Sequence, residues 1–242
     1  MILLLTGCIN PSGMSYTSLN NPKERERQYV NAIRYYLSKT NYPIVFTENS
    51  GSDISQLFTD SIKSGRMEYF TFNGNQDKAR GKGYGECEII EYALNNSAII
   101  NSAHDCQIAK ITGRLRILNI NSIIRIHRFI SSKKSVLCAI NSVLSFPDSR
   151  FFIAPIDFYR AFTKKKETIN DSDGFFFEHT LCNVIKEEKS YPFSPFLLMP
   201  RIEGVSGSTG EVYNGETIKL SFAIKYVKYA FSQRIKFYKL YR

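Results

Sequence analysis

The sequence has few residues of the kinds that build disulfide frameworks or zinc sites. Its 242 residues include three histidines and five cysteines, an odd number, with no Cys-x-x-Cys or histidine-paired spacing. This pattern argues against both a disulfide framework and a zinc cluster. A reducing compartment suits such a chain, and we expect a cytoplasmic protein. The cysteines are Cys8, Cys87, Cys106, Cys138 and Cys182.

Long apolar runs are also missing. No stretch approaches the roughly 18–20 uninterrupted apolar residues of a transmembrane helix. The letters LTGC at residues 5–8 resemble a lipoprotein cleavage box. However, the apolar run 2–5 is shorter than the roughly 7–15 apolar residues of a signal sequence, and no basic segment precedes it. We interpret residues 2–9 as the buried first strand of a parallel sheet instead.

Common enzyme signatures are absent as well. The glycine-rich segment 81–85 is not a Walker A sequence and lacks the spacing of a dinucleotide fingerprint. No Gly-x-Ser-x-Gly elbow supports a serine hydrolase. His104 lies in an expected loop and His127 on an expected basic helix, and we predict that both are solvated.

The sequence does contain the material for a large core. It is 43% hydrophobic and 22% charged, and 32 Lys and Arg against 22 Asp and Glu give a net charge of +10. Domains usually contain ~100–200 residues, so the chain can form one large domain or one domain with an appendage. This composition excludes intrinsic disorder, collagen and a coiled coil.

Strand-like and helix-like segments alternate along the chain, which is typical of a parallel sheet covered by helices. We therefore predict an α/β fold with a Rossmann-like mixed sheet, mostly parallel, and helices on both faces. A short extended segment is expected at 196–200 and a Gly-Ser loop at 204–210. Predicted strands are 2–9, 44–47, 67–72, 107–112, 135–141 and 150–154, and predicted helices are 23–37, 54–63, 86–101, 119–129, 157–162 and 176–186.

Residues 217–242 differ from the rest of the chain in composition. They contain seven basic residues and no acidic one, interleaved with aromatic residues, and they account for most of the net charge. A helix with basic residues beside an apolar face is typical of helices that lie on anionic membranes. The alternatives are a terminal helix docked on the domain and a nucleic-acid-binding segment. We predict one domain over 1–210 and a basic aromatic helix for membrane attachment over 211–242.

Glycines and polar residues follow the predicted strands. Ligands of open α/β sheets bind at the carboxyl ends of the strands, so these positions are candidates for a binding site. Segments 50–53 and 81–85 each precede a helix and can offer backbone N–H groups to an anion, with ordinary turn glycines as the alternative. The candidates are Gly7, Asn10, Glu48, Asn49, Ser50, Lys82, Gly83, Tyr84, Gly85 and Glu86.

The fourth predicted strand ends in a cationic segment. Lys110 and Arg114 bracket the residues Ile111, Thr112 and Gly113. A guanidinium at this strand end can hold a diphosphate through two parallel hydrogen bonds. Lys110, Thr112, Gly113 and Arg114 are therefore binding candidates, and a surface pair with acidic neighbours is the alternative.

Five segments carry a resemblance to a known family. They are LLLTGC (3–8), residues 25–36, PIVFTENSG (43–51), GKGYGE (81–86) and KITGR (110–114). Together they resemble bacterial surface-polysaccharide glycosyltransferases, those of capsule, O-antigen and lipooligosaccharide synthesis, over roughly residues 1–200. The resemblance implies a GT-A-type fold, a nucleoside-diphosphate-sugar donor and a saccharide or lipid-linked glycan acceptor. It also implies work at the inner face of the cell membrane.

The resemblance comes with a difference at the expected metal site. GT-A enzymes usually carry Asp-x-Asp after the fourth strand to hold a divalent metal on the donor diphosphate, whereas this chain has Thr-Gly-Arg at 112–114. Mn²⁺ and Mg²⁺ need carboxylate oxygens. We assign no metal ligand, and expect Lys110 or Arg114 to supply the counter-charge. Asp-Ser-Asp at 171–173 lies in a polar loop, and we interpret it as a turn.

By the same resemblance, two later segments belong to the sugar and acceptor side. Asp148 and Arg150 are candidates for contacts to sugar hydroxyls. Glu178, with His179 beside it as a binding candidate, opens a helix where inverting enzymes place a carboxylate base. Flanking phenylalanines would raise the pKa of Glu178 toward the range useful for taking a proton from the attacking hydroxyl. The alternative is that Glu178 pairs with His179 or a backbone amide at the helix start.

The sequence therefore predicts a glycosyltransferase, inverting if Glu178 is its base, although retaining enzymes share the fold. Two alternatives come from other classes: a basic nucleic-acid-binding α/β protein and a non-catalytic subunit of a polysaccharide-assembly complex. Polar residues gathered at strand ends favour the enzyme, for which no nucleic-acid partner is expected. The sugar, the acceptor, the linkage and the oligomeric state are not predicted.

Overall fold

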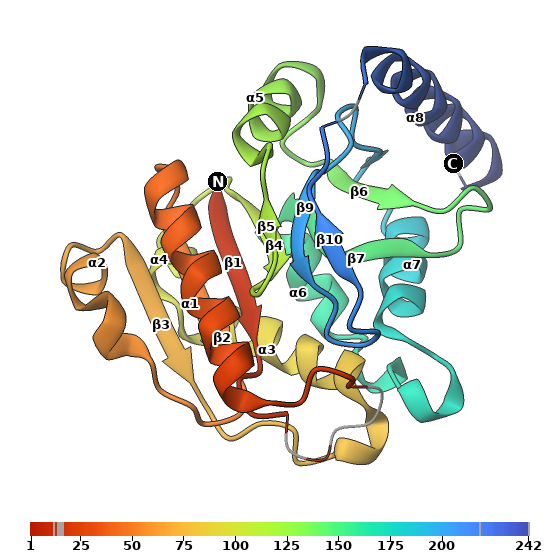
Figure 1. Cartoon of the computed structure of the whole chain (residues 1–242). Helices are drawn as coiled ribbons and strands as arrows, with labels where there is room; N and C mark the ends of the chain where they lie inside the picture. Colours follow the sequence, from red (N-terminus) through yellow and green to blue (C-terminus); the bar gives the residue numbers. More distant parts are fainter. Residues whose placement is uncertain (12, 14–16, 218, 242) are drawn as a thin grey trace.

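The computed structural model describes residues 1–11, 13, 17–217 and 219–241, and its centre is a seven-stranded sheet (Figure 1). The strands are β1 (Ile2–Gly7), β2 (Ile44–Glu48), β3 (Met67–Thr71), β4 (Gln107–Thr112), β6 (Val136–Ile140), β7 (Pro147–Pro155) and β8 (Phe193–Ser194). Their order is β3-β2-β1-β4-β7-β6-β8. Strands β1 to β4 are mutually parallel, β7 is antiparallel to both of its neighbours, and β8 is parallel to β6. The predicted mixed, mostly parallel α/β sheet is confirmed.

Helices cover both faces of this sheet. They are α1 (Pro22–Lys39), α2 (Thr59–Lys63), α3 (Lys82–Asn96), α4 (Ala98–Asn101), α5 (Ile120–Ile130), α6 (Ile156–Thr163), α7 (Phe177–Glu187) and α8 (Leu220–Tyr241). Every residue of β1 is buried, because side chains alternate between two covered faces. Leu4 packs in the core formed with α3, α6 and α7, whereas Leu3 and Leu5 pack in the core formed with α1 and α5.

A second, three-stranded sheet was not predicted. It consists of β5 (Arg116–Ile117), β9 (Ile202–Val205) and β10 (Val212–Asn214), all antiparallel. The expected extended segment 196–200 forms no strand, and β8 lies just before it. The β9–β10 hairpin spans the predicted division between 210 and 211, so the two-part domain organisation stays a prediction.

Two helix boundaries differ from prediction. The helix expected at 86–101 begins at Lys82 and is split by Ser97 into α3 and α4. Residues 82–85 are therefore the first turn of a helix and not a loop. The helix expected at 54–63 begins as a 3₁₀ turn, Ser55–Phe58, and continues as α2.

His127 is buried on α5, which makes the prediction of a solvated side chain wrong. Its Nε2 lies 2.9 Å from Oε1 of Gln107 on β4, and burial lowers its pKa to about 4. His127 faces the sheet because it follows Ile120, Ile123 and Ile124 on the apolar side of the helix. His104 is exposed, as predicted.

The C-terminal helix α8 contacts β8, and Figure 1 shows it beside β6. Phe237 is buried against Phe193, with ring centroids 4.6 Å apart, and Nε2 of Gln233 donates to the carbonyl of Ile140 at 2.8 Å. One face of the predicted terminal helix is thus packed on the domain. Arg242, at its end, lies outside the described residues. Among the helices described, none is long and apolar enough to cross a membrane.

Candidate functional site

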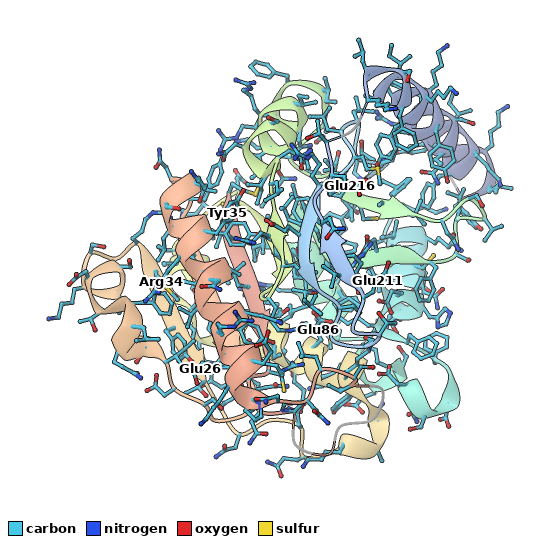
Figure 2. All side chains as sticks on the ribbon, in the orientation of Figure 1. Glu26, Arg34, Tyr35, Glu86, Glu211 and Glu216 are labelled. Carbon is cyan, nitrogen blue, oxygen red and sulfur yellow. The ribbon has the colours of Figure 1, made fainter. Side chains whose placement is uncertain are left out.

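A cavity of about 650 Å³ opens at the carboxyl ends of β1, β2 and β4. From β1 the chain runs outward through β2 to β3 and then crosses back to β4 on the other side of β1. Open α/β sheets bind ligands at such a reversal of strand order. Figure 1 shows the tip of the β9–β10 hairpin at the end of the sheet to which the β1 arrow points. Glu86 lies at this end of the molecule too (Figure 2).

The structure brings together many of the predicted site residues and separates others from the cavity. Those that line it come from the ends of three strands, the start of α3, β7 and α7. The lining residues are Gly7, Asn49, Lys82, Gly83, Glu86, Thr112, Arg114, Asp148, Arg150 and Glu178. Candidates that lie outside the lining are Asn10, Glu48, Ser50, Tyr84, Gly85, Lys110, Gly113 and His179.

Two arginines line the cavity where loops meet above β1. Arg25 of α1 is 5% exposed, and its Nε and Nη1 donate to the carbonyls of Cys8 and Leu19 at 2.7 and 3.0 Å. Arg114 is 8% exposed, and its Nη1 donates to the carbonyl of Val205 in β9 at 2.8 Å. Both guanidinium groups are therefore held by backbone carbonyls.

Gly113 forms the turn that places Arg114 at the cavity. Its N–H donates to the carbonyl of Thr6 at 2.8 Å, and a Cβ at this position would lie 2.7 Å from that same oxygen. Only glycine allows β4 to continue into Arg114 this close to β1. Gly113 thus acts through backbone geometry and lies outside the cavity lining.

Glu48 braces the turn behind the cavity. Its side chain is fully buried, and its two carboxylate oxygens accept from the N–H groups of Ile9, Ser50 and Ser52 at 2.8–3.0 Å. The hydroxyl of Ser50 accepts from the N–H of Asn10 at 2.9 Å. Glu48, Ser50 and Asn10 therefore join the loops after β1 and β2 and do not face the cavity.

The start of α3 is capped by a side chain from a distant segment. Asp171 is buried, and its Oδ2 accepts from the N–H of Gly83 at 3.0 Å. Burial raises the pKa of this carboxyl, and the N–H of Gly83 lowers it. The predicted turn at 171–173 is a 3₁₀ turn, Asp171–Asp173. Because the capping carboxylate occupies this helix end, the expected use of these N–H groups by an anion has little support.

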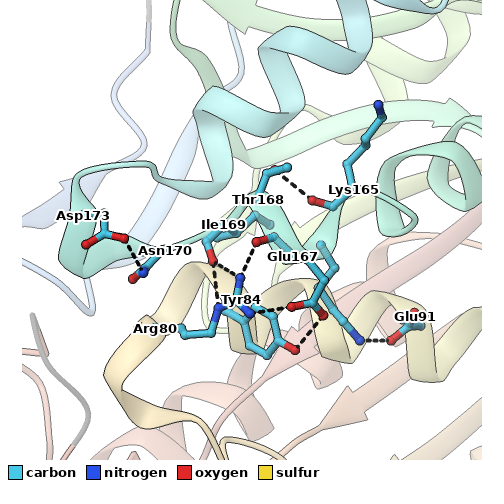
Figure 3. Close-up of polar contacts among 10 residues, drawn as sticks. Arg80, Tyr84, Glu91, Lys165, Glu167, Thr168, Ile169, Asn170 and Asp173 are labelled. Atoms are coloured by element: carbon cyan, nitrogen blue, oxygen red, sulfur yellow. Dashed lines mark hydrogen bonds and ion pairs between the residues drawn. The ribbon is translucent and has the colours of Figure 1, made fainter.

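Tyr84 turns outward from the same helix. Its hydroxyl donates to Oε1 of Glu167 at 3.1 Å, and the guanidinium of Arg80 lies 4.2 Å from its ring centre (Figure 3). Arg80 also donates to the carbonyl of Ile169 at 3.2 Å. This cluster fastens the start of α3 to the segment before α7.

The floor of the cavity contains a largely buried ion pair, in which the side chain of Glu86 is 23% exposed. Lys110 is fully buried; its Nζ pairs with Oε1 of Glu86 and donates to the carbonyl of Ser149 at 2.6 Å. The hydroxyl of Thr6 donates to the same Glu86 oxygen at 3.0 Å. Lys110 therefore lies beneath the surface to which Glu86 contributes. The predicted role of Lys110 in holding a diphosphate is not supported, because its charge is neutralised below the floor.

Glu178 faces the cavity from the first turn of α7. The hydroxyl of Ser149 donates to its Oε1 at 2.5 Å. Burial raises the pKa of Glu178, the hydrogen bond from Ser149 lowers it, and of two nearby charges Glu86 raises it and Lys110 lowers it. Of the alternative partners at the helix start, His179 accepts from the N–H of Phe176 instead, whereas the backbone N–H of Glu178 itself donates to the carboxylate and lowers its pKa. Glu178 is a partly desolvated carboxyl group next to a cavity, which is the environment of a proton acceptor.

His179 belongs to an aromatic cluster at the helix start. Its Nδ1 accepts from the N–H of Phe176 at 3.0 Å, and its ring stacks on that of Phe176. Asp148 and Arg150 pair with each other on the cavity wall, with Nη2 and Oδ2 2.7 Å apart, and Arg150 lies over the ring of Tyr213. The cavity thus has an aromatic and polar wall beside Glu178.

Sequence reasoning missed Arg25, which lines the cavity. Arg25 gives no signal in the sequence, because the periodicity of α1 does not show which of its arginines turns inward. The β9–β10 tip contains the predicted Gly-Ser loop, for which the sequence allows two roles, closing over a donor or forming a hinge to the tail. In the structure residues 206–209 line the cavity: the carbonyl of Gly207 accepts from the N–H of Ser18 at 3.0 Å, and Lys82 donates to the hydroxyl of Ser208. Loop residues from distant parts of the chain thus close one side of the site.

The residues present do not form a site for a divalent metal. Within the described part of the chain, no three His, Cys, Asp or Glu side chains group in a way that could hold a metal ion. The carboxylates of the cavity each have a protein partner: Glu86 pairs with Lys110, Asp148 with Arg150, Asp171 caps the start of α3, and Glu178 accepts from the hydroxyl of Ser149. The metal that the GT-A resemblance implies does not fit these residues.

Comparisons with known proteins give only distant similarities. No protein-family model and no curated protein sequence matches the chain. It is similar to a cytidylyltransferase from Leptospira borgpetersenii serovar Hardjo-bovis, with 12% identity and a TM-score of 0.45 over 81% of this chain and 75% of that one. It is also similar to HddC from Yersinia pseudotuberculosis, with 12% identity and a TM-score of 0.42 over 84% and 92% of the two chains. Mouse xyloside xylosyltransferase 1 is 9% identical, with a TM-score of 0.43 over 81% and 85%.

Proposed function

We propose that the protein is a glycosyltransferase that takes a sugar from a nucleoside-diphosphate donor and transfers it to a saccharide or lipid-linked glycan in the synthesis of a bacterial surface polysaccharide. The observation that carries the proposal is the division of one cavity into two chemical environments. Arg25 and Arg114 provide cations where an anionic donor would bind, and Glu178 provides a carboxyl group with a raised pKa near another wall. An inverting transferase that releases a nucleoside diphosphate uses both.

In the proposed reaction, Glu178 takes the proton of the attacking acceptor hydroxyl. The bond between C1 of the sugar and the β-phosphate oxygen breaks with its electron pair on the phosphate, and a new bond joins C1 to the acceptor oxygen. Attack from the face opposite the leaving group inverts the configuration at C1. A base positioned in this way contributes typically about 10²–10⁴-fold to the rate.

A nucleotide screen tests this function. Thermal unfolding is measured with UDP, GDP and CDP and their common sugar conjugates, each with EDTA and with Mn²⁺, and the free nucleosides serve as controls. At about a hundredfold excess over Kd, a ligand that binds only the folded state stabilises it by about 2.7 kcal/mol, which raises the unfolding midpoint by ~5–10 °C. We expect such a shift with one nucleotide family. No shift with any nucleotide contradicts the function.

We further propose that α8 attaches the protein to an anionic membrane surface at the cytoplasmic face. Ile224, Phe231 and Ile235 are 51%, 48% and 57% exposed although the helix is docked. Their spacing of seven and four residues places them on one side of the helix, where Lys228 and Lys239 also lie exposed. An apolar stripe beside lysines suits a lipid surface with negative headgroups.

Vesicle flotation tests this attachment. Removing α8 entirely would expose Phe193, so point variants are better suited. The pair Phe231→Ser and Ile235→Ser is expected to reduce binding to vesicles of phosphatidylcholine and phosphatidylglycerol by at least about tenfold, because two apolar side chains no longer insert. Leu57→Ser, at an exposed position before α2, is the matched control. Equal flotation of the double variant and the wild type rejects this role of α8.

A further inference from the structure

The guanidinium groups of Arg25 and Arg114 both lie close to one point in the cavity wall. That point is Gly207, at the tip of the β9–β10 hairpin. A Cβ on Gly207 would collide with the guanidinium of Arg114 and would lie 3.5 Å from Nη1 of Arg25. The two cations come from α1 and from the end of β4, and they converge beside the cavity.

Neither of these two charges has an acidic partner among the described residues. Among the ion pairs between described residues, none includes Arg25 or Arg114. The hydrogen bonds of both side chains go to neutral oxygens, those of Cys8, Leu19 and Val205 being the shortest. Nε of Arg114 is buried without a hydrogen-bond partner in the described structure.

Two unpaired cations, each more than nine-tenths buried, are costly for a folded protein. A bound anion with more than one negative charge would offset this cost. A guanidinium group matches two oxygens of a phosphate in its plane, so a pair of guanidiniums suits two linked phosphates. Lys82, which lines the same cavity and contacts Ser208, adds a third cation near the hairpin tip.

We infer that Arg25 and Arg114, assisted by Lys82, bind the diphosphate of the donor directly and without a divalent metal. The inference rests on the proposed function, because that function identifies the anion as the diphosphate of a donor. The part that excludes a divalent metal rests on the described cavity residues, which do not form a metal site. Arg114 was expected at this place from its position after β4, whereas Arg25 is assigned by the structure alone.

The test is calorimetric titration of the full chain with inorganic pyrophosphate and with UDP, CDP and GDP, in EDTA and in Mn²⁺. The variants Arg25→Gln and Arg114→Gln are each expected to weaken pyrophosphate and nucleotide binding at least about tenfold. Arg114→Lys keeps the charge but loses the planar fork, and an intermediate loss is expected. Arg34→Gln removes an exposed positive charge from the same helix as Arg25 and is the matched control. Circular dichroism shows whether each variant is folded.

The outcomes separate this inference from the proposed function. Binding in EDTA that both glutamine variants weaken, and Arg34→Gln does not, supports the inference. Nucleotide binding that needs Mn²⁺ and is unchanged in the folded variants overturns it while leaving the function intact. Pyrophosphate binding that depends on the arginines, without binding of any nucleotide, supports the anion site and contradicts the function. Binding of neither ligand overturns both.

Discussion

Replacing Glu178 by glutamine is expected to reduce turnover by about 10²–10⁴-fold while leaving donor binding within about twofold. Glutamine has nearly the same shape and can still accept the hydrogen bond from Ser149, but it cannot take a proton. The measurement is release of nucleoside diphosphate from the donor that stabilises the protein, with donor affinity measured separately. A loss confined to turnover identifies a group that acts in the transition state.

The matched control is Glu187→Gln on the same helix. Glu187 is exposed and lies 3.7 Å from Lys165 at the surface, so its substitution is expected to change neither affinity nor turnover. Glu178→Gln with full activity would assign the base to another group.

The pH dependence gives a second readout for Glu178. Burial raises the pKa of its carboxyl group, so the proton-accepting form appears at higher pH than for an exposed glutamate. Turnover should therefore rise with pH through a value above that of an ordinary glutamate. The same raised pKa means that the folded protein binds this proton more tightly than the unfolded chain, so the contribution of Glu178 to stability decreases as pH rises through this interval.

The second large effect is expected on stability. Lys110→Met should lower the free energy of unfolding by about 3–5 kcal/mol, because it leaves Glu86 without its buried cation. It also removes the hydrogen bond to the carbonyl of Ser149. Urea unfolding measures the change. Since Lys110 lowers the pKa of Glu178, the variant should also move the pH profile of turnover upward.

A double variant and a surface control complete this test. Adding Glu86→Gln to Lys110→Met removes the unpaired charge and should restore more than half of the lost stability, since replacing both partners of a buried pair is often nearly neutral. Lys165→Met, at an exposed pair, should change stability by less than about 1 kcal/mol. A Lys110→Met protein as stable as the wild type would show that the buried pair contributes little.

The strands of the central sheet could be predicted because their sequences are short apolar runs. Leu3, Leu4 and Leu5 have apolar side chains, which favour burial in a strand over exposure in a loop. The β9–β10 hairpin could not be predicted in the same way. It is short, half-exposed and without alternating hydrophobic residues, so its pairing with β5 depends on tertiary contacts such as that between Arg116 and Glu203.

The candidate site could be predicted only in part. Strand ends mark the cavity, and therefore Asn49, Thr112 and Arg114 could be named from the sequence. The sequence does not show in which direction an individual side chain points. Lys110 lies within β4, on the face that packs with α3, where its ammonium group pairs with Glu86. Gly83 was read as a loop residue because glycine is rare inside helices, whereas here contact with Asp171 requires it.

The β9–β10 hairpin has a consequence for how the protein folds during synthesis. The hydroxyl of Ser18 donates to the carbonyl of Ser208, 190 residues later in the chain, and Arg114 contacts Val205, 91 residues later. When synthesis has just passed β4, the nascent chain contains Arg25 and Arg114 but not yet the β9–β10 hairpin that covers them. Contacts of such long sequence separation form slowly, and the cavity is completed only after most of the chain has left the ribosome. The proposed donor nucleotide, if present at that stage, would favour the last step of folding by binding the completed site.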